Sequence, residues 1–337
     1  MLDGFKILYC QLKNTLIHNW SDWKGMIKKN KFIIGFFFIL IACFGYAQNP
    51  YVDSLANLLS TAKADTVKIN VLHNLFYEFE FSDAEKAGKY LNQAILISQK
   101  SNNKKGLSKS YLLLGFYSED RANYSEAVKH YQTALSINKA ISNDRGIADC
   151  YISMGNAYTY LGKYVEVLES YFAGLKIYEK LRIERGVASA YDNIGSFYAS
   201  QGDLENALKN NEASLEIFMR IGDKEGIAYA YNNIGIVYYK QGRYKEALEN
   251  HYASLKLKRE IGDSAGVGNS LNCIGATYNS MENYPEALKN YFESLRVESV
   301  VNDKNDIAAT NLNLGITKGW SGNAKIDCGR TSKRNYW

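Results

Sequence analysis

The chain has 337 residues, of which 46% are hydrophobic and 22% charged, with 26 Gly, only 2 Pro and a formal net charge of +5. This composition excludes wholesale disorder, collagen-like and Pro-rich chains, and a polytopic membrane protein. Residues 1–47 hold six Lys/Arg against two Asp/Glu, residues 318–337 hold five against one, and residues 48–317 hold 29 against 32. The body is therefore slightly acidic, which argues against a partner made of nucleic acid.

The segment from Met26 to Ala47 has the pattern of a signal peptide. Three lysines within residues 28–31 precede an apolar run over residues 32–44, and small residues then lead to a cleavage point before Gln48. The run is shorter than the roughly 20 residues that span a bilayer. We therefore expect a periplasmic or secreted protein.

Other interpretations of this end stay open. Residues 40–43 resemble a lipobox, which would make the protein a lipoprotein with its lipid on Cys43, and the apolar run could also serve as an uncleaved anchor. Residues 1–25 are interpreted as an upstream extension before a true start at Met26, and the alternative is an amphipathic leader.

The body of the sequence has a 40-residue repeat. Two glycine columns keep this step: Gly115, Gly155, Gly195, Gly235, Gly275 and Gly315 form one, and Gly106, Gly146, Gly186, Gly226 and Gly266 the other. Within each repeat, two apolar stripes at helical spacing are separated by a short break, which predicts two antiparallel helices. Since a lone pair cannot bury both stripes, the pairs must stack into an all-α solenoid.

The columns within one repeat resemble the tetratricopeptide repeat (TPR). They comprise Tyr151, Met154, Gly155, Tyr158, Gly162, Tyr164, Val167, Tyr171 and Gly174. The resemblance implies a right-handed α-α superhelix, a TPR solenoid of stacked antiparallel helix pairs. The step is longer than the one usual in this family, and in this it is similar to the long-repeat branch found in bacterial signalling proteins and peptide-sensing regulators.

The repeat pattern also sets the expected domain boundaries. These are a leading helix over 51–65, a degenerate capping repeat over 66–105, five repeats over 106–305, the start of a further repeat over 306–323, and an irregular tail over 324–337. The tail has two interpretations: a natural disordered end, or a frame disruption that truncates a longer protein in mid-repeat.

No catalytic pattern is found in the sequence. His73, His130 and His251 lack metal-ligand spacing, there is no CxxC, and no phosphate-binding glycine loop occurs. Cys150 occupies a column of small residues and is interpreted as a packing residue. We therefore expect no enzyme, no metal and no cofactor.

The resemblance to tetratricopeptide repeats implies a concave groove, lined by the first helix of each pair, that holds a protein or peptide ligand. The candidate groove residues are Asp149, Asn156, Tyr160, Asp192, Ser196, Tyr229, Asn232, Tyr239, Lys240, Asn269, Asn272 and Asn279. Amides interleaved with aromatic rings suit an extended peptide backbone. The other interpretation is that the Asn side chains only solvate an exposed helix face.

The family's clamp for C-terminal carboxylates is not expected here. Asn156 and Asn193 match its amide columns, but Ile152, Tyr229 and Asn233 occupy columns that should be basic. A carboxylate bound there would find no counter-charge.

The leading hypothesis is a non-catalytic TPR scaffold that binds a protein or peptide outside the cytoplasm. The alternative is a truncated sensory module of a membrane signalling protein whose transmembrane segment and kinase, cyclase or DNA-binding output are missing. A third hypothesis, a cytoplasmic peptide-responsive regulator, requires an unused leader. Membrane contact is expected only through a lipid on Cys43 or a missing C-terminal segment.

Overall fold

The computed structural model describes residues 50–80, 82–301 and 307–317. The chain divides into two compact units, Met1–Lys63 and Ala64–Trp337. The predicted signal peptide, the upstream extension and the irregular tail lie outside the described residues. Within the described ranges, no helix is both long enough and apolar enough to cross a membrane.

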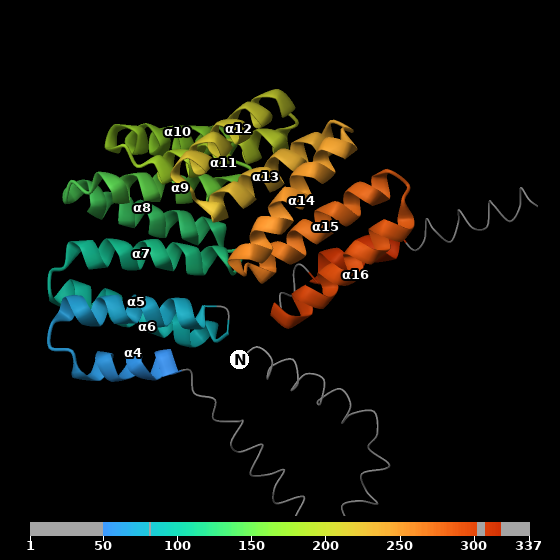
Figure 1. Cartoon of the computed structure of the whole chain (residues 1–337). Coiled ribbons are helices and arrows are strands. Elements are labelled where there is room, and N and C mark those ends of the chain that lie inside the picture. The colour runs from blue at the N-terminus through green and yellow to red at the C-terminus, as the bar shows by residue number, and fades with distance from the viewer. Residues whose placement is uncertain (1–49, 81, 302–306, 318–337) are drawn as a thin grey trace, which may run out of the picture. The chain divides into compact units, whose positions relative to one another are not determined.

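The fold of the described residues is all-α, as predicted from the 40-residue step. The first unit contributes α4 (Pro50–Thr61), and the second contributes a series of helix pairs and a helical segment over residues 307–317 (Figure 1). The pairs are α5 (Asp65–Phe79) with α6 (Ala84–Lys100), α7 (Lys104–Glu119) with α8 (Tyr124–Ala140), α9 (Asp144–Tyr160) with α10 (Tyr164–Leu181), α11 (Glu184–Gln201) with α12 (Leu204–Ile221), α13 (Lys224–Lys240) with α14 (Tyr244–Ile261), and α15 (Ser264–Ser280) with α16 (Tyr284–Val301).

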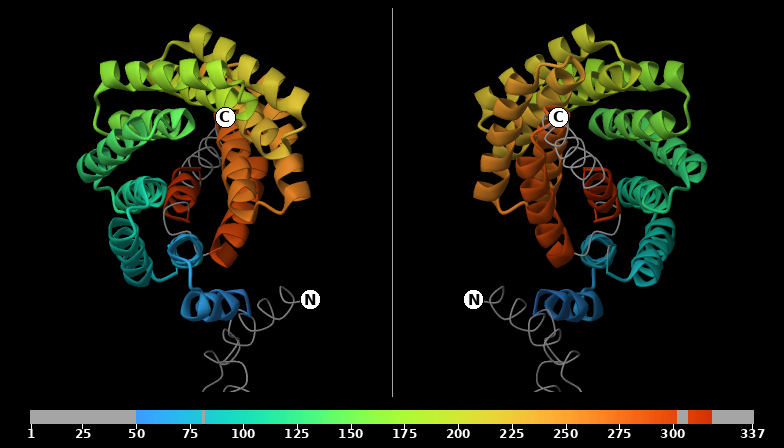
Figure 2. Two further views of the ribbon diagram at one scale, coloured as in Figure 1. Left: turned by 90° about the vertical axis from the view of Figure 1, so that its left-hand side faces the viewer. Right: turned by 90° about the vertical axis from the view of Figure 1, so that its right-hand side faces the viewer.

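The odd-numbered helices from α5 to α15, here called the first helices, form the inner face of the second unit. Each packs against the second helix of its own pair, and successive first helices also pack against one another. Each second helix packs against the first helix that follows it. Figure 2 shows these pairs following one another with a progressive turn. This is the sequential packing of an α-solenoid, in which each repeat buries the apolar stripe of its neighbour.

The connections between helices share one backbone feature, a residue in the left-handed conformation. From the α6–α7 connection to the α15–α16 connection, each connection contains one residue with positive φ, from Asn102 to Glu282. Glycine fills five of these positions, including Gly222 and Gly262, because only glycine adopts this conformation without steric cost. At several connections an Asp follows and accepts a hydrogen bond from the third backbone N–H beyond it, which caps the next helix.

Close approach of the two helices in a pair explains the glycine column that begins at Gly115. In each of five pairs the glycine of the first helix faces the residue sixteen positions later on the second helix. These partners are Tyr131, Tyr171, Asn211, His251 and Tyr291, and a Cβ on the glycine would lie closer than 3 Å to each of them. Gly315 differs, because a Cβ there would have nothing within 4 Å.

Replacing one glycine of this column should therefore lower stability, whereas replacing Gly315 should not. Gly155→Ala would drive a methyl group into the ring of Tyr171, which is 4% exposed, and we expect the free energy of unfolding to fall by about 1–3 kcal/mol. Gly315→Ala adds a methyl group in open space within a helix and should leave stability unchanged or raise it by up to about 1 kcal/mol. Urea denaturation of the full chain, followed by circular dichroism, measures both. Equal effects of the two substitutions would contradict the packing account.

One of the five side chains that face the glycine column, His251, is titratable. His251 is 1% exposed, and its Nδ1 atom has no hydrogen-bond partner. Burial, together with the nearby Lys258, lowers the pKa of His251 to about 4. The unfolded imidazole titrates near 6.5, so between these two values the unfolded chain binds the proton more readily. His251 therefore costs stability as the pH falls from about 6.5 towards 4.

Substitution by tyrosine, which fills this column at three other repeats, should remove that pH dependence. Between pH 7.5 and pH 5 the wild-type chain should lose about 2 kcal/mol of unfolding free energy through His251, and His251→Tyr should lose none of it. Half-buried carboxyls such as Glu80 and Glu119, whose pKa values are raised to about 7, act in the opposite direction. Their contribution is common to both proteins and cancels in the comparison. Parallel stability–pH curves for the two proteins would show the assignment to be wrong.

Candidate binding surface

The candidate groove residues all lie on the first helices α9, α11, α13 and α15, but they differ in exposure. Tyr160 is 70% exposed and Tyr229 45% exposed. Ser196, Lys240 and Asn269 are also exposed, whereas Asp149, Asn156, Asp192, Tyr239, Asn272 and Asn279 are half-buried and Asn232 is buried. The exposed members offer a ligand the larger share of the accessible surface among the candidates.

Many of the amides link one repeat to the next. Asn233 on α13 donates from Nδ2 to both carboxylate oxygens of Asp192 on α11, each at 2.9 Å. Asn232 donates to Asn269 on α15 at 3.4 Å. From the helical segment 307–317, Asn313 donates to Asn272 at 2.9 Å and Thr317 donates to Asn279 at 3.0 Å. These hydrogen bonds form a polar ladder along the first helices.

The ladder continues at the C-terminal ends of the first helices. Tyr239 on α13 shares a hydrogen bond of 2.9 Å with Ser280 on α15. Lys240 donates from Nζ to the backbone oxygen of Ala199 on α11 at 2.9 Å. The sequence alone did not reveal these pairings, although the polar partners Asn232 and Asn269, and Tyr239 and Ser280, lie 37 and 41 residues apart, close to the length of one repeat.

Two candidates near the start of the surface bind the second helix of their own pair. Tyr178 on α10 donates its hydroxyl to Asp149 at 2.6 Å, and Tyr171 donates to Asn156 Oδ1 at 2.7 Å. One acceptor atom of each candidate is therefore occupied within the fold. Among the residues that the structure describes, none accepts a hydrogen bond from Asn156 Nδ2, so this group can donate to a ligand.

Burial shifts the acidity of the carboxyls on this face. Burial raises the pKa of Asp192 to about 6, and the hydrogen bonds from Asn233 oppose that shift. At the C-terminal ends of α5 and α7, burial raises the pKa of Glu80 and of Glu119 to about 7, and the neighbouring Asp120 adds to both shifts. This end of the inner face is thus acidic, with carboxyls that are partly protonated near neutral pH.

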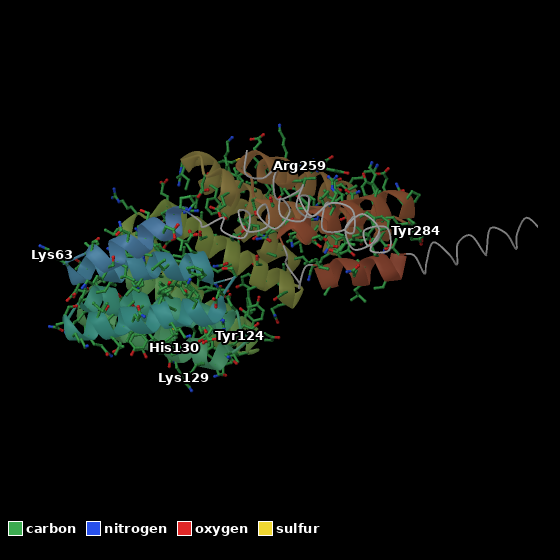
Figure 3. The ribbon with its side chains drawn as sticks, turned by 90° about the horizontal axis from the view of Figure 1, so that it is seen from below. Lys63, Tyr124, Lys129, His130, Arg259 and Tyr284 are labelled. Carbon is green, nitrogen blue, oxygen red and sulfur yellow. The ribbon has the colours of Figure 1, made fainter. Side chains whose placement is uncertain are left out.

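An aromatic pair stands between α8 and the C-terminal end of α9. The rings of Tyr124 and Tyr160 stack with centroids 4.5 Å apart and planes 5° apart. Figure 3 labels Tyr124 together with Lys129, His130 and Arg259. Lys129 pairs with Glu126 at 2.8 Å, and Arg259 pairs with Glu293 at 2.7 Å. Such exposed ion pairs on the second helices contribute little to stability.

Possible metal ligands and a buried thiol are present among the described residues. Among them, no group of three or more His, Cys, Asp and Glu could hold a metal ion. Cys150 is fully buried, and burial raises the pKa of its thiol to about 12, so it is not a nucleophile at neutral pH.

Comparison with known proteins agrees with the repeat pattern. Residues 186–260 match the tetratricopeptide repeat family. A search of curated proteins found no match.

Several solved structures share the fold. BtubC (BKLC) from P. vanneervenii has 19% sequence identity and a TM-score of 0.54, covering 67% of this chain and 93% of its own. A Rap protein in complex with Competence and Sporulation Factor has 16% identity and a TM-score of 0.57, covering 77% of this chain and 78% of its own. Aspartyl phosphate phosphatase F from Bacillus subtilis has 14% identity and a TM-score of 0.59, covering 86% and 79%.

These similarities concern the fold, since the three identities lie between 14% and 19%. The family match covers the helix pairs from α11 to α14 and no more. The 40-residue step, the left-handed connections and the glycine contacts extend the same construction to both sides of that match. Residues 186–260 therefore match tetratricopeptide repeats, and they lie within a solenoid of sequentially packed helix pairs.

Proposed function

We propose that the chain is a non-catalytic scaffold whose inner face binds an extended segment of a protein or peptide. The observation that carries this proposal is the exposure of Tyr160 on α9 and Tyr229 on α13, while the other first helices α11 and α15 bear the exposed Ser196 and Asn269. Aromatic rings supply contact area at low entropic cost, and amides pair with a peptide backbone. The Rap protein of similar fold was solved with Competence and Sporulation Factor bound, which supports a ligand-binding role for such a solenoid.

The polar ladder adds a second argument. Because the half-buried amides join successive first helices, the inner face is held in one arrangement before a ligand arrives. A surface that is already ordered loses less entropy on binding than a mobile one. The exposed rings then act as anchors on a rigid base.

The prediction is that binding depends on the exposed inner-face tyrosines. Twelve-residue peptides would be selected from a random display library against the full chain and measured by fluorescence polarisation. Tyr160→Ala and Tyr229→Ala should each weaken the selected peptides by at least about tenfold, the usual loss at an interface anchor. Met219→Ala, at a 49% exposed position on the second helix α12, is the matched control and should change affinity by less than about twofold. If the control weakens binding as much as the tyrosine variants do, the inner face is not the binding surface.

We further propose that the protein acts outside the cytoplasm. The support is the lysine-rich, then apolar, then small-residue pattern from Met26 to Ala47. Full-length protein produced in a bacterium should appear in the periplasmic fraction with Gln48 as its first residue, as read by mass spectrometry. A lipid-modified Cys43 at the N-terminus would instead identify a lipoprotein, and an uncleaved cytoplasmic chain would exclude export and favour the cytoplasmic regulator.

The truncated sensory module remains the alternative function. It differs from the scaffold in requiring a membrane segment and an output domain encoded beyond residue 323. Sequencing of the genomic DNA past that codon, read in all three frames, separates the two. Resumed repeats followed by an apolar stretch of about 20 residues would favour the sensor.

A further inference from the structure

An apolar cavity of about 520 Å³ lies on the second helix α10, where this helix meets the C-terminal end of α11. The second helices form the outer face of the solenoid, away from the inner face (Figure 2). Five of the seven lining residues belong to α10, and Phe197 and Gln201 come from α11. Phe197 is buried and Leu168 half-buried, whereas Val165 is 68% and Phe172 47% exposed. The cavity is therefore open to solvent and edged by exposed apolar side chains.

The repeat itself does not require apolar side chains at this edge. In the two columns of Val165 and Phe172, the other second helices α8 and α12 carry polar or charged residues: Ser125 and Gln132 in α8, and Glu205 and Glu212 in α12. Both of these helices pack within the solenoid as α10 does. Exposed apolar side chains that packing does not need, placed around a hollow, are typical of an interaction site.

Carboxylates predominate on the surface around the cavity. α10 and α12 are successive second helices, and both pack against α11. Six of their carboxylates form no ion pair with a described residue: Glu166, Glu169, Glu179, Glu205, Glu212 and Glu216.

The cations of the same two helices do not balance these carboxylates. Lys180 and Arg220 are already neutralised, because they pair with Asp144 at 3.1 Å and with Glu184 at 3.2 Å on the first helices. That leaves one unpaired lysine on each helix, Lys176 on α10 and Lys209 on α12. The outer surface of α10 and α12 is thus acidic, with an apolar cavity in it.

Helix stability does not explain this excess of carboxylates. Glu166 and Glu169 are three residues apart on α10, and Glu212 and Glu216 are four apart on α12. Like charges at these spacings destabilise a helix. Of these four, Glu166 alone lies in a first turn, where the helix dipole favours a negative charge. Glu169 also lines the cavity, so its charge faces whatever binds there.

We propose that the outer surface of α10 and α12 binds a basic amphipathic helix of a partner protein, whose apolar side chains enter the cavity and whose Lys or Arg side chains meet the carboxylates around it. An amphipathic helix carries an apolar stripe flanked by charged side chains, which matches an apolar hollow edged by carboxylates. The site goes beyond the proposed function, because it lies on second helices, whereas the proposed peptide contacts Tyr160 and Tyr229 on first helices. The two ligands would not compete.

The charge of the surface decides among the possible occupants. A second copy of the chain would bring two acidic surfaces together, and like charges across an interface cost free energy. An anionic membrane would repel the same carboxylates. A basic helix brings the opposite charge and an apolar stripe in one element.

The test uses the full chain and dye-labelled peptides of about 18 residues, which form about five helical turns. The basic probe has Leu and Phe along one stripe and Lys elsewhere, the neutral probe has Gln in place of each Lys, and the polar probe has Ser in place of each Leu and Phe. By fluorescence polarisation, the basic probe should bind at least about tenfold more tightly than either other probe, since each lacks half of the match. Equal binding of the basic probe and either of the others would overturn the proposal.

Variants taken from neighbouring repeats locate the site. Val165→Ser/Phe172→Gln gives α10 the residues that α8 has in the same columns, and Glu169→Lys gives α10 the residue that α8 and α12 have there. Each should weaken binding of the basic probe by at least about tenfold. The matched controls are Tyr252→Gln, at a 42% exposed position, and Glu249→Lys, which occupy the same columns on α14. Each control should change the affinity by less than about twofold.

The fold should tolerate these substitutions, since the repeat already accepts the same residues on a neighbouring second helix. Melting followed by circular dichroism checks this. If the apolar double variant melts below the wild type, Glu169→Lys, at an exposed carboxylate, decides alone. Unchanged binding in Glu169→Lys, or an equal loss in the α14 controls, would show the assignment to be wrong.

The other occupants are distinguished by further outcomes, each of which would also overturn the proposal. Weaker binding of the basic probe to Tyr160→Ala or Tyr229→Ala would place that probe on the inner face. Self-association in sedimentation velocity that is lost in Phe172→Gln would identify a second copy as the occupant. Binding to anionic lipid vesicles that is lost in the same variant would identify a membrane. Failure of the basic probe to bind leaves the proposed function intact, because the inner face is tested with its own selected peptides.

Discussion

The structure depends on one contact that recurs from pair to pair, the approach of a glycine on the first helix to a large side chain on its partner helix. Because the glycine has no Cβ, a ring of Tyr131, Tyr171 or Tyr291 lies directly against the backbone of the first helix. This contact brings the two helices of a pair close together. The opposite side of the first helix is then free to pack against the neighbouring first helices. The inner face, with its polar ladder, follows from that arrangement.

The sequence predicted most of the fold because repetition makes weak signals add up. A single Gly-to-Tyr spacing means little, but several such spacings in register predict stacked helix pairs. The left-handed connections could be predicted from the sequence only in part. Glycine or Asn102 occupies some of these positions, but Ala122, Ser142, Arg182 and Glu282 take a conformation that their side chains do not favour. Their place in the regular series of connections, rather than their chemistry, imposes it.

The candidate surface could be predicted only in part. Column position correctly assigned the candidates to the first helices, but it did not show which amides would bond to the next repeat. Asn232 and Asn233 are adjacent in sequence, yet one meets Asn269 on the following repeat and the other meets Asp192 on the preceding one. The unpaired cations near the N-terminal ends of α7 and α9 were missed for a related reason. Lys105, Lys109 and Arg145 belong to two different repeats, and their lack of counter-charges depends on where every nearby carboxylate lies in space.

The two ends of the first helices near the start of the inner face differ in charge, which a count of charges does not reveal. Lys105, Lys109 and Arg145, which form no ion pair with a described residue, lie near the N-terminal ends of α7 and α9, and Glu80 and Glu119, whose pKa values are raised, lie near the C-terminal ends of α5 and α7. Both arrangements run against the helix dipole. A peptide bound along this face would therefore meet ends of opposite charge, which would orient its own charges and so select one chain direction.

The regular connections affect how such a chain can change during evolution. Since one left-handed residue ends each helix from α6 to α15, every repeat begins and ends with the same backbone geometry. Duplication or deletion of one repeat would leave the flanking repeats in their original contacts, because each repeat touches only its neighbours. The length of the inner face can thus be altered by whole repeats, while the side chains on each repeat diverge independently.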